Sequence, residues 1–121
     1  MSTGRQNSAL GAYGERVAER HLVDDGLTVL DRNWRCAAGE LDLVLRDGDT
    51  LVFCEVKTRS GTAYGHPLEA VGPAKTDRLV RLADAWIDAH QVSAPQVRFD
   101  VVAVLLVPGA APQVEHYEGA F

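Results

Sequence analysis

The sequence is poor in several features that mark particular classes of protein. It contains only two cysteines, Cys36 and Cys54, which argues against a disulfide framework and makes the reducing cytoplasm the expected compartment. The longest clear apolar run covers residues 101–107, far short of the ~20 residues of a membrane-spanning helix. The N-terminus is polar and lacks the apolar segment of a secretory signal. These absences predict a cytoplasmic globular protein without a membrane partner.

The chain is also short of positive charge. Its 12 Lys and Arg residues against 17 Asp and Glu residues give a net charge of −5, whereas nucleic-acid-binding domains are usually basic. The charge is uneven, however, because a group of basic residues lies in the middle of the chain: Arg32, Arg35, Lys57, Arg59, Lys75, Arg78 and Arg81. The sequence is therefore compatible with a local basic rim around an acidic centre. The four histidines show no metal-ligand spacing.

Length and periodicity predict one α/β domain spanning residues 1–121, with a flexible tail at 1–8. The expected elements are a helix at 9–25, strands at 27–35, 40–47 and 50–57, a mobile loop at 58–72, a helix at 73–90, a strand at 96–107 and a short strand at 113–117. The first helix should bury Tyr13, Val17, Ala18 and Leu22, and the second Leu79, Val80, Ala83, Trp86 and Ile87. Short connections make the first three strands antiparallel, and the second helix crosses over to a parallel fourth strand. The order α-β-β-β-α-β(-β) predicts a mixed sheet flanked by helices.

Two charged pairs face each other across the predicted hairpin. Glu40 and Asp42 are two residues apart and share one face of a strand, as do Glu55 and Lys57. A two-residue loop at 48–49 would place Asp42 opposite Glu55 and Glu40 opposite Lys57. The other face of the hairpin is apolar and should be core; it carries Leu41, Leu43, Leu45, Val52, Cys54 and Val56.

Opposed carboxylates at Asp42 and Glu55 destabilise a hairpin, since two charges ~5 Å apart repel by roughly 3 kcal/mol at an effective dielectric of ~20. Lys57 would offset part of this repulsion, and a divalent cation would offset more. Hard cations such as Mg²⁺ take oxygen ligands, often one or two carboxylates with water and phosphate. From the pattern alone two interpretations stay open: a metal site with an adjacent lysine, or a solvated face of cross-strand ion pairs.

The order of elements, with Asp42, Glu55 and Lys57 placed on it, resembles the PD-(D/E)XK nuclease superfamily, which includes junction resolvases and restriction endonucleases. The chain is still more similar to the YraN-like uncharacterised bacterial proteins. The residues that carry this likeness are Gly11-x-x-Gly14-Glu15, Arg32-Asn33-Trp34-Arg35, Gly39-Glu40-Leu41-Asp42-Leu43-Val44, Phe53-Cys54-Glu55-Val56-Lys57-Thr58-Arg59, Tyr64-Gly65, Lys75 and Arg98-Phe99-Asp100-Val101-Val102. Glu40-Leu41-Asp42 departs from the superfamily pattern, which often has Pro-Asp here. The resemblance implies a restriction endonuclease-like fold.

The resemblance also implies roles for individual residues. Asp42, Glu55 and the carbonyl of Val56 would bind Mg²⁺ or Mn²⁺, and Lys57 would position the attacking water. Glu15 would approach the metal from the first helix, where an acidic residue is also stabilised by the helix dipole. The expected nucleic-acid contacts are Arg35, Arg59 and Lys75. Two alternatives stay open: a salt bridge at the rim for Arg59 and a solvated side chain for Lys75.

The implied activity is metal-dependent hydrolysis of DNA phosphodiester bonds, in branched or single-stranded DNA, by a homodimer. Two alternatives stay open: a catalytically inactive nucleic-acid-binding module with the same fold, and a protein-interaction domain.

Several other residues have a structural interpretation. Glu40 is expected to pair with Lys57, and Arg98 with Asp100. Gly11 and Gly14 form a weak phosphate-loop pattern, for which entry into the helix is the preferred explanation. Trp34 could stack on an unpaired base, but an aromatic residue in a strand more often belongs to the core.

Overall fold

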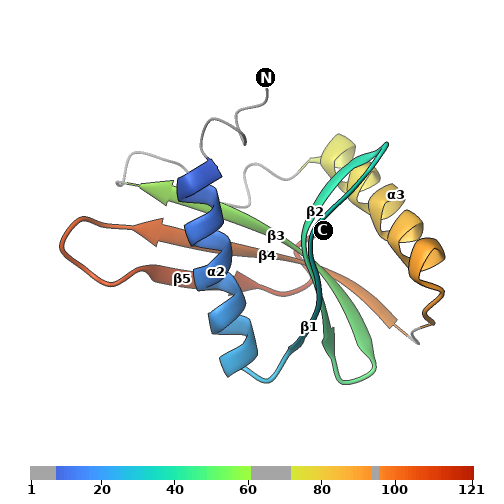
Figure 1. Ribbon diagram of the computed structural model, residues 1–121, viewed down its shortest axis with the longest axis horizontal. Coiled ribbons are helices and arrows are strands. Elements are labelled where there is room, and N and C mark those ends of the chain that lie inside the picture. Colours follow the sequence, from blue (N-terminus) through green and yellow to red (C-terminus); the bar gives the residue numbers. More distant parts are fainter. Residues whose placement is uncertain (1–7, 61–71, 94–95) are drawn as a thin grey trace.

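The computed structural model describes residues 8–60, 72–93 and 96–121 of the chain. Two helices and five strands follow one another as α2 (Ser8–Asp24), β1 (Thr28–Cys36), β2 (Gly39–Asp47), β3 (Thr50–Ser60), α3 (Pro73–His90), β4 (Gln96–Leu106) and β5 (Gln113–Tyr117). The strands form one sheet in the order β1-β2-β3-β4-β5 (Figure 1). Strands β3 and β4 are parallel, and the other neighbours are antiparallel. The predicted fold class and order of elements are confirmed.

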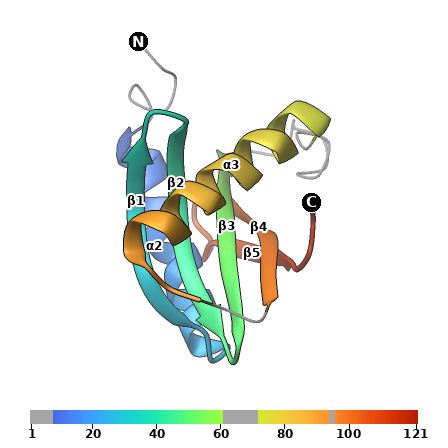
Figure 2. The same cartoon turned by 90° about the vertical axis from the view of Figure 1, so that its right-hand side faces the viewer.

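The two helices cover opposite faces of the sheet (Figures 1 and 2). Under α2 lies a cluster that includes Leu43, Leu45, Val52 and Cys54, and under α3 lies a second cluster. The second cluster includes Leu41, Val44, Leu51, Phe53, Leu79, Leu82 and Trp86. The predicted core residues of the hairpin are therefore in the core, but they do not share one face, because Leu41 belongs to the second cluster. The near-continuous apolar runs of β2 and β3 are those of strands buried on both sides.

The helices bury slightly different residues from those expected. In α2 the buried positions are Gly14, Ala18 and Leu22, at a spacing of four, while Tyr13 is 43% exposed. In α3, Leu82 is buried and Val80 is 40% exposed, which corrects the prediction for Val80. Small residues at two of the three buried positions of α2 allow this helix to lie close to the sheet.

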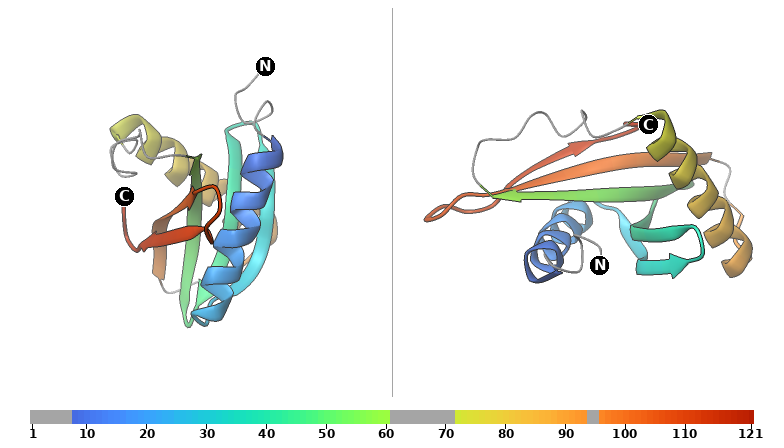
Figure 3. Two further views of the ribbon diagram at one scale, coloured as in Figure 1. Left: turned by 90° about the vertical axis from the view of Figure 1, so that its left-hand side faces the viewer. Right: turned by 90° about the horizontal axis from the view of Figure 1, so that it is seen from above.

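Strand β3 is longer than the sequence indicated. Its last residues, Thr58–Ser60, were expected in a loop, but they pair with Val104–Leu106 of β4. The rest of the predicted mobile loop, residues 61–71, lies outside the described residues, as do residues 1–7 of the predicted tail. Strands β3, β4 and β5 extend past α2 at the end of the sheet away from α3 (Figure 3). Within the described residues, no helix combines the length and apolar character needed to cross a membrane.

A polar network ties the C-terminal segment to β4. Asp100 is fully buried and accepts hydrogen bonds from Arg98 Nε and Nη2, both at 2.9 Å, and from the backbone N–H of Gly119 at 3.0 Å. His116 Nε2 lies 2.7 Å from Asp100 Oδ2. Burial alone would raise the pKa of Asp100, but the contacts with His116, Arg98 and Gly119 lower it below its ordinary value. The predicted Arg98–Asp100 pair is confirmed, and His116 is an additional partner that its spacing did not indicate.

Candidate metal and nucleic-acid site

The site lies where β2 and β3 separate. The ladder between these strands includes the predicted Asp47–Thr50 pair and ends at Leu43–Cys54. Beyond that pair, β2 continues alongside β1 alone, while β3 continues alongside β4 (Figure 1). The backbone N–H of Val56 is left without a ladder partner and donates to Asp42 Oδ2 at 2.9 Å. The expected ladder pairing of Asp42 with Glu55 was therefore wrong, but the Asp42 side chain itself reaches β3.

Asp42 is a half-buried acid among other acids. Burial raises its pKa to about 7, the negative charges of Glu15, Glu55 and Glu40 add to this effect, and the Val56 N–H opposes it. The Asp42 carboxyl consequently titrates near neutral pH. A cation placed here would stabilise the charged form of Asp42 and offset the repulsion from its neighbours.

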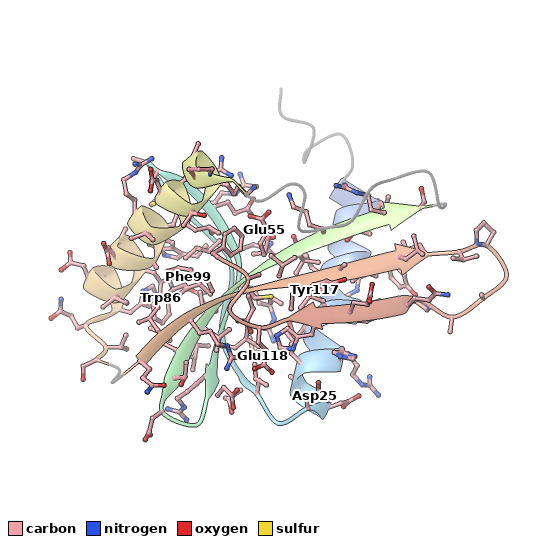
Figure 4. All side chains as sticks on the ribbon, turned by 180° about the vertical axis from the view of Figure 1, so that it is seen from behind. Asp25, Glu55, Trp86, Phe99, Tyr117 and Glu118 are labelled. Atoms are coloured by element: carbon pink, nitrogen blue, oxygen red, sulfur yellow. The ribbon has the colours of Figure 1, made fainter. Side chains whose placement is uncertain are left out.

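Glu55 lies on β3 and contacts two lysines. Its side chain is 11% exposed, and Oε2 lies 2.7 Å from Lys57 Nζ and 3.0 Å from Lys75 Nζ. Neither contact has the angular geometry of a hydrogen bond, so Oε2 is a buried oxygen held by charge alone. Lys57 comes from the same strand, whereas Lys75 comes from the first turn of α3. Figure 4 shows Glu55 near the N-terminal end of α3.

Glu15 approaches Asp42 from α2. The two acids line a pocket of about 510 Å³ between α2 and the β1–β2 pair, together with Arg16, Arg32 and other residues. Glu15 Oε1 accepts a hydrogen bond of 2.8 Å from Asn33 Nδ2. Asn33 has a left-handed backbone with φ of 49°, a conformation that asparagine tolerates better than most residues. Glu15 thus lies beside Asp42, and Asn33 is the residue that holds it.

The remaining predicted residues lie further along the strands. Arg35 is in β1, and its Nε is 3.4 Å from Glu40 Oε2. The expected Glu40–Lys57 pair was therefore wrong, because β2 has already left β3 at Glu40 and stays with β1. Arg59 follows Lys57 by two residues on β3 and is partly buried. The structure brings Lys75 to the centre of the site and leaves Arg35 on the β1–β2 pair.

Two nearby residues have structural roles. Trp34 packs against the cluster under α3, as the core interpretation predicted, and meets the His90 ring edge-on at a centroid distance of 6.0 Å. Cys54 is 2% exposed. Burial raises the pKa of its thiol, and the negative charges of Asp100, Asp42 and Glu55 raise that pKa further. Cys54 is therefore an unreactive core residue.

The donor atoms are of the type that hard cations prefer. Asp42 and Glu55 supply carboxylate oxygens, Val56 supplies a backbone carbonyl, and Glu55 Oε2 is a buried oxygen without a hydrogen-bond donor in good geometry. Across the described ranges, no group of three or more His, Cys, Asp or Glu side chains has the arrangement to hold a metal ion. Mg²⁺ or Mn²⁺ would therefore be held here by two carboxylates and water rather than by a cage made of protein atoms alone.

Sequence reasoning missed Asn33 and the role of Gly14. Asn33 has a signal of its own, since asparagine is enriched at left-handed positions in strand irregularities. Gly14 is buried in α2 and faces Thr58 of β3, so its function is close packing rather than phosphate binding or helix entry. The spacing of four between Gly14, Ala18 and Leu22 was the available signal.

Comparison with known proteins places the chain in a family. The model of "Uncharacterised protein family UPF0102" matches residues 14–104. A UPF0102 protein of Beutenbergia cavernae is 59% identical over 115 residues, which cover 95% of this chain and 98% of that protein. A UPF0102 protein of Streptomyces griseus is 55% identical over 112 residues, covering 92% and 94% of the two chains. The chain therefore belongs to the UPF0102 family.

Proposed function

We propose that this protein is a metal-dependent endonuclease that hydrolyses DNA phosphodiester bonds. The observation that carries the proposal is the 2.9 Å hydrogen bond from the Val56 N–H to Asp42 Oδ2, which brings Asp42 to the strand of Glu55 and Lys57. Two acids and an ammonium group then share one small, largely buried region. This combination of oxygen ligands and a neighbouring cation is suited to phosphoryl chemistry, in which charge must be stabilised on a phosphate.

Asp42, Glu55 and the Val56 carbonyl would hold Mg²⁺ or Mn²⁺, which when bound polarises a phosphoryl oxygen and lowers the pKa of water. Lys57 is held by Glu55 at 2.7 Å and is partly screened from solvent. Its ammonium group would orient the attacking water and stabilise charge on the phosphate. Glu15 is oriented by Asn33 and supplies further negative charge toward the cation.

The substrate is inferred from the charges around the site. Arg16, Arg20 and Arg32 line the pocket that Asp42 and Glu15 share. Arg16 and Arg20 would contact backbone phosphates, whereas Arg32 is already hydrogen-bonded to Glu19. The net charge of −5 limits non-specific binding. The family resemblance extends the proposal to branched or single-stranded DNA and to a homodimer. Sedimentation analysis of the free protein tests the homodimer.

Cleavage of end-labelled DNA with Mn²⁺ tests the activity. The substrates are duplex, single-stranded and four-way-junction DNA, and the variants are Asp42→Asn and Lys57→Met. Asp84→Asn on the exposed side of α3 is the matched control. We expect both site variants to lose at least about 100-fold in rate, as is usual for groups that act in the transition state. Unchanged cleavage by both would contradict the assignment of the site.

The same experiment separates the two alternatives. Salt-sensitive DNA binding without cleavage by the native protein would indicate a binding module that has the nuclease fold but no turnover. Absence of both Mn²⁺ and DNA binding, together with co-purification of one partner protein, would indicate an interaction domain. Calorimetry with Mn²⁺ and fluorescence anisotropy with labelled DNA provide these measurements.

A further inference from the structure

The position of Lys75 is unusual for a lysine. Its side chain is only 23% exposed, although lysines are mostly exposed in folded proteins. It lies in the first turn of α3, which contains no acidic residue and begins at Gly72 without a side-chain cap. The dipole of the helix disfavours a cation at this end. The contact with Glu55 offsets that cost, so this acid holds Lys75 in the site.

Glu55 is shared between two cations. Lys57 and Lys75 both place Nζ within 3.0 Å of the same oxygen, Glu55 Oε2. One carboxylate cannot neutralise both, and two ammonium groups this close repel each other. Lys57 has the shorter contact and lies on the strand of Glu55, whereas Lys75 belongs to a separate helix. Lys75 is the more easily displaced of the two.

We propose that Lys75 is a displaceable counter-ion of the metal site. In the metal-free protein its ammonium group occupies the oxygen of Glu55 that a divalent cation would bind. When the cation binds, Lys75 leaves Glu55 and contacts a phosphate of the nucleic acid. This inference rests on the proposed function, and it gives Lys75 two alternative partners of the same charge. DNA binding through Lys75 then depends on the cation.

Titration of the DNA-free protein with Mn²⁺ in a calorimeter tests the competition. Lys75→Met removes the charge and keeps the aliphatic stem, and it should bind Mn²⁺ about three- to tenfold more tightly than the native protein. Lys75→Arg keeps a cation and should stay within about twofold of the native affinity. Arg81→Met is the matched control, because it removes one charge from an exposed position on the same helix. Thermal melting in EDTA verifies that each variant folds.

DNA affinity with and without a cation tests the second half of the proposal. Ca²⁺ takes oxygen ligands and serves here as the probe, with intact DNA verified on a gel. In Ca²⁺, Lys75→Met should reduce the magnitude of the slope of log affinity against log salt by about one, the value expected for one lost phosphate contact. In EDTA the slope of this variant should equal that of the native protein. Arg81→Met should have the same effect, if any, under both conditions.

The outcomes distinguish this inference from the proposed function. If the native protein cleaves DNA with Mn²⁺ and Lys75→Met binds Mn²⁺ no more tightly than it does, Lys75 is not a competitor and only this inference fails. A loss of DNA affinity by Lys75→Met that is equal in EDTA and Ca²⁺ would also overturn it. If the native protein neither binds Mn²⁺ nor cleaves DNA, both proposals fail together.

Discussion

Gly14 of α2 and Thr58 of β3 approach each other so closely that a methyl group at Gly14 would lie 1.9 Å from Thr58 Oγ1. The same methyl group would lie 2.8 Å from Thr58 Cβ, next to the backbone of β3. Thr58 directly follows Lys57, and Gly14 directly precedes Glu15. This contact therefore sets the distance between the helix that carries Glu15 and the strand that carries Glu55 and Lys57.

Gly14→Ala should disturb both folding and the site. The added methyl group cannot be accommodated by a rotamer change of the β-branched Thr58, so α2 must move, at a cost of about 1–3 kcal/mol. Gly11→Ala is the control, because a Cβ there meets nothing within 4 Å. It should stabilise the helix by up to about 1 kcal/mol. Urea denaturation of both variants measures these changes.

A second substitution tests whether Thr58 is the cause. Thr58→Ala in the Gly14→Ala background removes Oγ1 and Cγ2 and should recover part of the lost stability, which a double-mutant cycle quantifies. An additive cycle, with no recovery, would show that Gly14 is required for another reason.

Asn33 has two separable functions that different substitutions distinguish. Its backbone has φ of 49°, and its amide donates to Glu15 Oε1 at 2.8 Å. Asn33→Gly keeps the backbone freedom and loses the amide, so its stability should stay within about 0.5 kcal/mol of native. Asn33→Ala should lose about 1 kcal/mol more, since it also strains the backbone. Melting curves in EDTA measure this difference.

The same pair of variants reports on Glu15. Both lose the hydrogen bond that orients its carboxylate, so both should reduce Mn²⁺-dependent cleavage by a similar factor, about tenfold. Full cleavage by Asn33→Gly would show that Asn33 serves the backbone alone and that Glu15 needs no such support.

The sequence predicts the fold well because its local signals agree with one another. The turn between Asp47 and Thr50, the apolar Cys54 and the helix start at Pro73 each specify local structure through turn chemistry, burial or a fixed φ. Strand alternation failed at Asp42, because it assumes that two paired strands stay paired. Where β2 leaves β3, the carboxylate of Asp42 replaces a backbone carbonyl as the acceptor for the Val56 N–H. The two-residue alternation of side chains along a strand does not indicate where this replacement occurs.

The sequence indicated the side chains of the candidate site more readily than their contacts. Type and spacing singled out Asp42, Glu55 and Lys57, and the family resemblance added Glu15, but the partners of Glu40 and Glu55 depend on tertiary geometry. Glu40 follows β1 and pairs with Arg35, while Glu55 gains Lys75 from a helix that begins 18 residues later in the sequence. The ion pairs of long side chains depend on which elements meet in space, and this information lies outside any local window.

The Arg98–Asp100 pair should be important for stability and unimportant for chemistry. Arg98→Met leaves the fully buried Asp100 with less compensation for its charge, and we expect a loss of about 3–5 kcal/mol in the free energy of unfolding. Glu118→Gln removes an exposed partner of Arg98 at 3.6 Å and should cost less than about 0.5 kcal/mol. Urea denaturation at pH 7 compares the two. A small effect of Arg98→Met would mean that His116 and Gly119 alone satisfy Asp100.

The raised pKa of Asp42 predicts an inverted pH dependence for the metal-free protein. Its ordinary pKa of 3.8 rises to about 7 on folding, so between these values the native state binds more protons than the unfolded state. The stability that this group contributes is fully present below about pH 4 and is lost as the pH rises through 7. In EDTA, Asp42→Asn should not lose stability as the pH rises through 7. Its amide oxygen still accepts the hydrogen bond from the Val56 N–H but carries no charge.

We therefore expect Asp42→Asn to be more stable than the native protein at pH 8 by about 2–4 kcal/mol, and nearly equal to it at pH 4. Thermal melts across this range measure the difference, with Asp84→Asn as the exposed control whose effect should not depend on pH. Mn²⁺ at pH 8 should raise the melting temperature of the native protein and leave that of Asp42→Asn unchanged, since a bound cation stabilises the folded state through this carboxylate. A less stable Asp42→Asn at pH 8 in EDTA would show that the charged carboxylate is already compensated inside the protein, and that no cation is needed to stabilise it.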